Sequence, residues 1–168
     1  LAPAAHGGNR TGRVFTGDRS ADFLFKCLFE AGFSNQPNSI NKNDGLLLNN
    51  LYLTTALKCV PPGDKPTSLE LKTCFNYFNE EIKYLKNISI IVALGKIAYD
   101  ACINFYKQKY DIKNKDYIFG HGSYHKLPDH KILIGSYHPS PRNVNTGRIN
   151  EVKMVNLLIK VKKELDKK

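Results

Sequence analysis

The sequence of 168 residues has no tryptophan, a single methionine and only four cysteines. No apolar run reaches the roughly 20 residues that a membrane helix needs, and no segment resembles a secretory leader. We therefore expect a soluble, intracellular protein with no membrane partner. In that compartment structural disulfides are rare, so the cysteines should be core residues or metal ligands.

Acidic residues are also scarce, because 15 aspartates and glutamates face 25 lysines and arginines. The formal net charge of +10 favours an acidic partner such as nucleic acid, through neutralisation of phosphates. A lysine-rich surface that serves only solubility would give the same charge. The hydrophobic share of 42% is enough for one domain over residues 1–168.

The opening segment, residues 1–18, combines glycines with hydrogen-bond donors. Its glycines permit backbone shapes closed to other residues, and its donor side chains suit an anion or the edge of a base. The alternative is an irregular surface loop made of turn-forming residues. A phosphate-binding P-loop is excluded, since the final Gly-Lys-Ser/Thr is absent.

Hydrophobic periodicity and capping signals predict alternating strands and helices along the chain. The predicted helices cover residues 20–31, 67–85, 96–110 and 150–165, and the predicted strands cover residues 51–56, 88–94 and 131–137. Such alternation predicts an α/β fold with a parallel sheet between two helical layers. The site loop has no strand before it, so we expect a first strand ahead of Leu1 and a truncated N-terminus.

Two segments resemble the signatures of a known family. Residues 1–18 are similar, almost letter for letter, to the first signature loop of uracil-DNA glycosylases of family 5. Residues 136–147 resemble the second signature, in which a histidine and a Pro/Ser loop leave the last strand. The resemblance implies a three-layer α/β/α sandwich with a mainly parallel, four-stranded sheet. It also implies a prokaryotic DNA repair enzyme that flips out uracil and hydrolyses its N-glycosidic bond, leaving an abasic site.

The resemblance assigns chemical roles to residues of both signatures. His138 would donate a hydrogen bond to uracil O2 as negative charge develops there. Asn9 would orient the attacking water, with His6 as the alternative. Phe15 would stack on the extruded base, although a core aromatic would fit the same pattern.

The second signature would also contact DNA. Its loop, residues 139–146, would enter the minor groove, with Arg142 filling the gap left by the flipped nucleotide. Ser140, Asn143 and Thr146 are candidates for phosphate contacts, although each could equally serve the turn itself.

Four positions depart from better-known relatives. Many relatives carry a carboxylate at the position of Ala2, or at Leu1 in the family-4 branch, and a tyrosine at that of Ala4. Thr55 stands where relatives carry an asparagine that faces the uracil edge. The methyl group of Ala4 should widen the pocket, so hypoxanthine and other deaminated bases are expected substrates as well. Neither Ala2 nor Leu1 can accept a proton, and the hydroxyl of Thr55 cannot make the paired contact of an amide.

Cys59 and Cys74 resemble the half-site that gives two ligands to the [4Fe–4S] cluster of families 4 and 5. The other two ligands would come from a segment ahead of Leu1, since a cluster needs four thiolates. Cys27 and Cys102 lie in helical apolar patterns and are expected in the core.

Two other functional classes remain open. One is a damage-binding module of the same fold without turnover, which would fit the absence of a carboxylate at Ala2 and Leu1. A phosphate-binding hydrolase or nucleotide transferase would need a metal-binding carboxylate cluster.

For the enzyme we expect a monomer that acts on double- and single-stranded DNA, with a sliding clamp as a possible partner. His121 would line the pocket or, as we prefer, only turn the chain.

Overall fold

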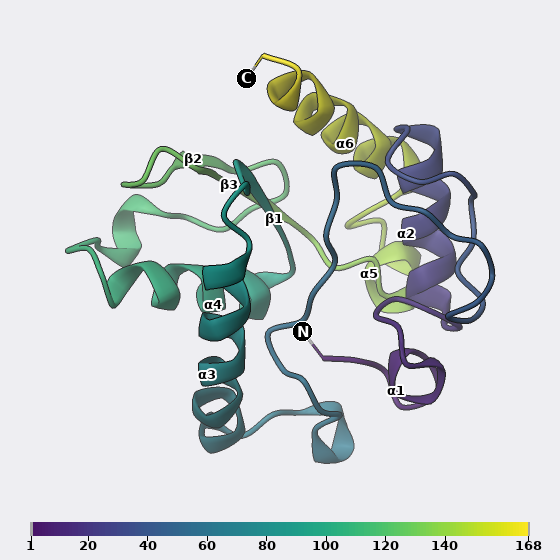
Figure 1. Ribbon diagram of the computed structural model, residues 1–168, viewed down its shortest axis with the longest axis horizontal. Coiled ribbons are helices and arrows are strands. Elements are labelled where there is room, and N and C mark those ends of the chain that lie inside the picture. Colours follow the sequence, from purple (N-terminus) through teal and green to yellow (C-terminus); the bar gives the residue numbers. More distant parts are fainter. Residues whose placement is uncertain (1, 168) are drawn as a thin grey trace. The chain divides into compact units, whose positions relative to one another are not determined.

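The computed structural model describes residues 2–167, apart from the side chain of residue 64 (Figure 1). The chain forms two compact units. Residues 56–138 make up the first unit, and residues 2–55 together with those from Pro139 onward make up the second. The chain passes from one unit to the other after Thr55 and again after His138.

The first unit contains the sheet, whose strand order is β1-β3-β2. Strand β1 (Ile90–Leu94) pairs in parallel with β3 (Ile132–Ser136), and β2 (Tyr124–Lys126) pairs with β3 in antiparallel orientation. All residues of the central strand β3 are buried, whereas in β1, the β-branched strand, only Ala93 is fully buried and the others are half-buried.

Two long helices complete the first unit. Helix α3 (Ser68–Tyr84) begins with a capping box, in which Thr67 accepts from the backbone of Glu70 and Glu70 reaches back to Thr67. Helix α4 (Lys96–Lys107) follows β1 after Gly95 and contacts that strand. Short 3-10 turns occur at η1 (Pro62–Asp64) and η2 (Asn114–Asp116). One apolar core joins both helices to the sheet and includes Phe78, Ala93, Tyr99, Cys102, Ile103, Phe105, Tyr106, Leu127 and Leu133.

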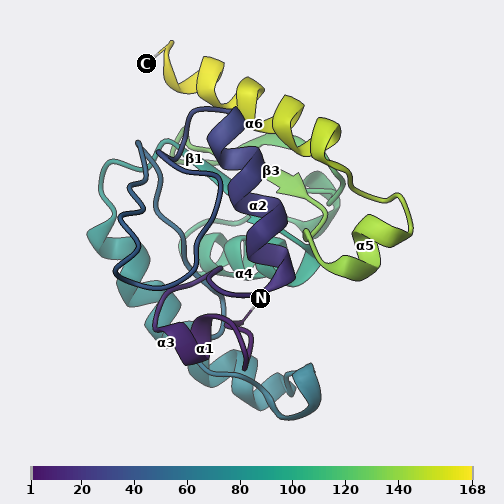
Figure 2. The same cartoon turned by 90° about the vertical axis from the view of Figure 1, so that its right-hand side faces the viewer.

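The second unit consists of helices and loops. Helix α2 (Arg19–Glu30) lies beside α6 (Glu151–Leu165), as Figures 1 and 2 show. Lys26 forms an ion pair with Glu151 at 2.7 Å, and Lys162 donates to the carbonyl of Ala31 at 3.3 Å. The short helices α1 (Gly8–Thr11) and α5 (Pro141–Asn145) belong to the two signature segments.

One sequence prediction about the sheet is wrong. Residues 51–56 form no strand, because an apolar stretch rich in Leu, Thr and Tyr indicates burial, whereas a strand also needs a neighbour, and no described strand pairs with this segment. The described residues form three strands, and the four-stranded sheet stays a prediction. Strand β2 was not predicted, because it is only three residues long and reads Tyr-His-Lys. The second helical layer of the sandwich and the single domain stay predictions.

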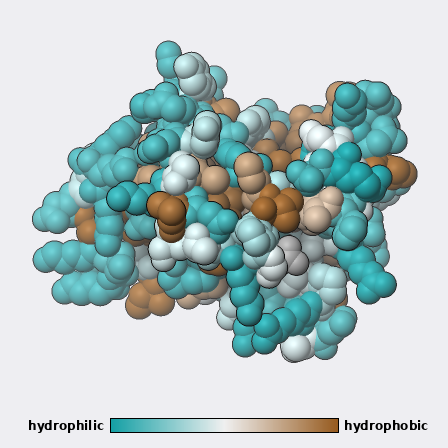
Figure 3. Space-filling view, turned by 90° about the horizontal axis from the view of Figure 1, so that it is seen from below, coloured by the Kyte–Doolittle hydropathy of each residue, from teal (hydrophilic) through white to brown (hydrophobic). Residues whose placement is uncertain are grey.

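The helix predictions hold more closely. Asn150 caps α6 as expected, whereas the N-cap of α2 is Asp18 rather than Ser20. No described helix has both the length and the apolar content needed to cross a bilayer. Hydrophilic side chains cover most of the face seen in Figure 3, with scattered apolar ones between them.

Candidate active site

His138 lies at the carboxyl end of the parallel strand pair. Strands β1 and β3 end in register, with Leu94 paired to Ser136. The amide of Gly95 donates to the carbonyl of Ser136 at 2.7 Å. A Cβ atom on Gly95 would lie 3.4 Å from Cβ of His138, so the start of α4 is in contact range of the histidine. Gly95 has a φ of 101°, a conformation that favours glycine.

Burial keeps the His138 side chain neutral at neutral pH, because it lowers the pKa of the imidazole to about 4. A neutral imidazole carries one N–H donor and one acceptor. The group can therefore donate a hydrogen bond to an oxygen that gains negative charge, without being a cation beforehand.

The segment of residues 119–123 also reaches the end of β3. His121 places its Nδ1 atom 3.2 Å from Oγ of Ser136, and its ring stacks on Tyr137. The residue does lie in a turn, as predicted. The contact of this turn with the two residues before His138 has no signal in the sequence, because it joins parts of the chain that only the sheet brings together.

The opening loop folds into the small turn that leads to α1. The carbonyl of Ala4 accepts from the amides of Gly7 and Asn9, both at 3.1 Å, and Arg10 donates to the carbonyl of His6 at 2.8 Å. These bonds bring Ala4, His6 and Asn9 together on one turn, where all three are exposed. Ala2 is half-buried just before them.

The opening loop ends in a carboxylate, Asp18, whose role was not predicted from the sequence. Oδ1 of Asp18 accepts from the amide of Ala21 and so caps α2, at 2.9 Å. Oδ2 lies against Gly7, where any Cβ atom would collide with it. An aspartate directly before a helix is an N-cap signal, but sequence alone does not show that its second oxygen returns to the loop.

Phe15 occupies a strained backbone conformation in this loop, with a φ of 51°. Its neighbours are fixed by what we call the Arg13 clamp, consisting of Arg13, Thr16, Ser39 and Asp44. The guanidinium of Arg13 donates to Thr16 at 3.0 Å, to Ser39 at 2.8 Å and to Asp44 at 2.6 Å. The hydroxyls of Thr16 and Ser39 are 2.7 Å apart and both residues are buried.

Asp44 is the anchor of the clamp. The hydrogen bond from Arg13 holds the pKa of the Asp44 carboxyl well below its usual range, and backbone amides of Ile40, Leu46 and Asn41 lower it further. The carboxylate is therefore ionised at neutral pH. No local motif in the sequence connects Asp44 with Arg13.

The second signature forms a capped helical turn after His138. Ser140 is the N-cap of α5 and accepts from the amide of Asn143 at 3.4 Å, while Thr146 donates to the carbonyl of Arg142 at 2.8 Å. Ser140 and Thr146 thus serve the turn, which was the alternative to phosphate contact. Arg142 is exposed. Thr55 is buried.

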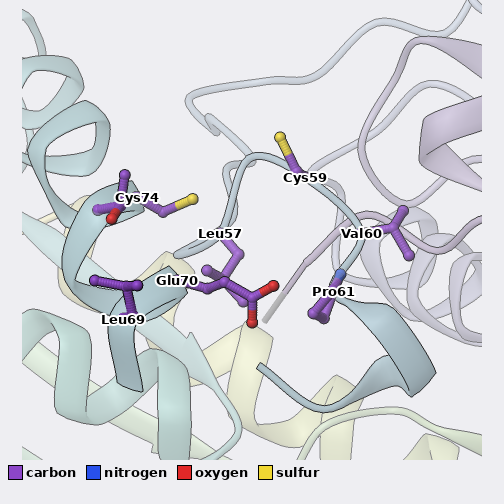
Figure 4. Close-up of a pocket in the computed structure, with 8 residues that line it drawn as sticks. Leu57, Cys59, Val60, Pro61, Leu69, Glu70 and Cys74 are labelled. Carbon is purple, nitrogen blue, oxygen red and sulfur yellow. The ribbon is translucent and has the colours of Figure 1, made fainter. Parts of the chain in front are cut away.

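Cys59 and Cys74 border the same cavity of about 310 Å³ in the first unit (Figure 4). Its other lining residues are Leu57, Val60, Pro61, Leu69, Glu70 and Thr73. The described residues contain no group of three or more metal-ligating side chains. Two thiols on one cavity fit half of a four-thiolate set, and they do not complete it.

Cys27 and Cys102 are buried in α2 and α4, as predicted. Burial raises the pKa of both thiols to about 12. Neither is therefore a thiolate near neutral pH, and neither borders the cavity of Cys59 and Cys74.

Comparison with known proteins places the chain in a family. Residues 1–162 match the model of the uracil DNA glycosylase superfamily. The chain belongs to this superfamily. It is 40% identical over 163 residues to a protein of Thermus thermophilus named type-5 uracil-DNA glycosylase. Proteins with the same name from Pyrobaculum aerophilum and Mycobacterium tuberculosis are 44% and 41% identical over 149 and 164 residues.

The alignments cover most of this chain but less of the relatives. They include 97%, 89% and 97% of the chain, and 72%, 62% and 60% of the Thermus, Pyrobaculum and Mycobacterium proteins. The resemblance of the two signatures to the superfamily is thus confirmed, and the relatives' names agree with the family-5 branch.

Proposed function

We propose that this chain removes uracil from DNA by hydrolysing the N-glycosidic bond of an extruded deoxyuridine. The main support is His138, a neutral imidazole at the end of β3 and beside the start of α4. Cleavage leaves the bonding electron pair on N1 of uracil, and the negative charge spreads onto the carbonyl oxygens of the base. A fixed N–H donor at O2 stabilises that charge more than it stabilises the substrate, which lowers the barrier.

We assign the attacking water to the opening loop. Asn9 orients the water, and Asp18 supplies a carboxylate that can accept its proton while the oxygen adds to C1′ of the sugar. The placement of Asp18 Oδ2 against Gly7 supports this assignment. His6 is the alternative for the orienting role.

The remaining signature residues act on the DNA. Phe15 stacks on the flipped base, and Arg142 fills the gap that the base leaves. Asn143 and Ser140 lie at the same turn, close to the backbone of the DNA. The small side chains of Ala2 and Ala4 and the hydroxyl of Thr55 leave room for hypoxanthine and xanthine, in double- or single-stranded DNA.

We further propose that Cys59 and Cys74 hold one side of a [4Fe–4S] cluster, which stabilises the fold without entering the reaction. Their shared cavity supports this role. Iron content per chain, measured after anaerobic reconstitution of a longer version, should fall in Cys59→Ser and Cys74→Ser and stay unchanged in Cys27→Ser. We place the enzyme inside a prokaryotic cell as a monomer, with a sliding clamp as a candidate partner.

An alkali assay tests the proposed activity. Duplex DNA with one uracil is incubated with the protein and then heated in alkali, which breaks the strand wherever a base has been removed. We expect breaks with the wild-type chain and a loss of about 10²-fold or more in His138→Ala, with DNA affinity nearly unchanged. His125→Ala, a change of another histidine of the first unit, is the matched control.

The other outcomes decide between the functional classes. Tight binding of the uracil duplex without strand breaks would favour a damage-binding module, which the alanine at position 2 keeps open. The proposal would be refuted if the protein did not bind the uracil duplex and produced no strand breaks. The same assay with hypoxanthine and xanthine in place of uracil gives the substrate range.

A further inference from the structure

A turn of residues 119–123 lies across the end of β3. The amide of Gly122 donates to the carbonyl of Gly135 at 2.8 Å, and the amide of Gly135 donates to the carbonyl of Ser123 at 3.0 Å. A Cβ atom on Gly135 would come within 2.6 Å of the carbonyl oxygen of Gly120. The missing side chain at Gly135 therefore lets the turn approach the strand directly.

His121 sits at the tip of this turn and contacts two consecutive residues of the strand end. Its Nδ1 atom is 3.2 Å from Oγ of Ser136, which is fully buried. Oγ of Ser136 donates its own proton to the carbonyl of Tyr137 at 3.1 Å. Oγ of Ser136 is therefore within hydrogen-bond distance of both the His121 ring and the Tyr137 carbonyl.

The same ring also holds Tyr137. The two rings stack with their centroids 5.9 Å apart and their planes at 19°, and Phe119 packs edge-on against Tyr137 with a centroid distance of 6.0 Å. Residues 136 and 137 are therefore fixed from the turn, through one hydrogen bond and one stack.

We infer that His121 is a positioning residue for His138. The next residue after Tyr137 is His138, so the backbone direction at residues 136–137 sets where its imidazole points. This inference rests on the proposed function, because only a reacting His138 makes the direction matter. Misplacement of a catalytic group by about 1 Å costs up to about 10²-fold in rate.

His125 provides a matched comparison within the same unit. It is also a half-buried histidine next to aromatic rings, with Nε2 3.1 Å from the carbonyl of Ile118 and ring contacts to Tyr99 and Tyr117. None of these partners belongs to residues 136–138. A general loss of packing should affect both histidines alike, whereas positioning of His138 should depend on His121.

The test uses the full chain with three substitutions, His121→Phe, His121→Asn and His125→Phe. Phenylalanine keeps the stack on Tyr137 and removes the hydrogen bond to Ser136, whereas asparagine puts a polar atom close to the place of Nδ1. We expect His121→Phe to slow single-turnover excision of uracil by about tenfold, with the Kd for uracil-free DNA unchanged. His121→Asn should recover most of that rate, and His125→Phe should keep it.

A second readout does not depend on activity. The ¹⁵N resonances of the His138 imidazole should shift in His121→Phe, return toward wild type in His121→Asn and stay in place in His125→Phe. An unchanged rate in His121→Phe, or an equal loss in His121→Phe and His125→Phe, would overturn the inference. If the wild-type chain excises nothing, the proposed function fails, and unmoved His138 resonances would then overturn the positioning role separately.

Discussion

Asp44→Asn should destabilise the protein more than any other single change of a charged residue in the opening loop's surroundings. In the wild type, Oδ2 of Asp44 accepts from Arg13 at 2.6 Å and from the amides of Ile40 and Asn41 at 2.7 and 3.2 Å, while Oδ1 accepts from Leu46 at 3.1 Å. An amide has only one oxygen, so either orientation turns an NH₂ group toward at least one N–H donor. The ion pair with Arg13 is lost as well.

The size of this effect follows from burial. The side chain of Asp44 is 7% exposed and that of Arg13 is 24% exposed, so water replaces the lost partner poorly. Breaking a buried pair costs about 3–5 kcal/mol, and an unpaired buried polar group costs about 1–3 kcal/mol. Because Arg13 is partly exposed, we expect a loss of roughly 2–4 kcal/mol in the free energy of unfolding. Urea denaturation at pH 7 measures it.

The control and the pH dependence make this prediction specific. Asp100→Asn removes an exposed ion pair, whose carboxylate side chain is 45% exposed, and should cost less than about 1 kcal/mol. The pKa of Asp44 is lowered in the folded state, so its contribution is complete above the ordinary carboxyl pKa near 3.9 and declines as the pH falls below it. The gap between wild type and Asp44→Asn should therefore shrink from pH 5 to pH 3. Equal losses in both variants at pH 7 would refute the reasoning.

Three further predictions concern the site and its support. Because burial lowers the pKa of His138 to about 4, the excision rate should show no inflection from this residue near pH 6.5, and a fall in rate toward pH 4 should disappear in His138→Ala. The same shift means that the His138 contribution to stability is complete above pH 6.5 and declines between pH 6.5 and 4, as urea midpoints can show. Gly95→Ala forces a φ of 101° on alanine and should lower the free energy of unfolding by about 1–3 kcal/mol. It should also lower the excision rate, and an unchanged rate would show that Gly95 does not support the site. Thr67→Ala removes the cap of α3 and should lower stability by about 1 kcal/mol while the excision rate stays the same.

Local signals account for the parts of the fold that the sequence predicted well. The Thr67 and Glu70 pair and Asn150 fix helix starts through bonds within three residues, so their patterns are readable without tertiary information. The buried run of β3 is similarly readable, because an apolar segment of that length has few other solutions. Residues 51–56 show the limit of this reasoning, since a strand also needs a neighbour to pair with.

Long-range contacts explain what the sequence did not predict at the candidate site. The bond between Arg13 and Asp44 spans 31 positions, and that between His121 and Ser136 spans 15. Both are formed by single side chains, and neither follows a spacing rule. The histidine at position 138 was predictable because family resemblance marks it, whereas the residues that hold the surrounding backbone carry no signature.

The composition of the second unit has a consequence for synthesis on the ribosome. Helix α2 packs on α6, and the ion pair of Lys26 with Glu151 joins segments that lie on either side of residues 56–138 in the sequence. Residues 56–138 form the first unit from one continuous stretch, so this unit can fold once that stretch has left the exit tunnel. The face of α2 that packs on α6 stays uncovered until α6 has been made, so we expect chaperones to bind the nascent chain at this helix.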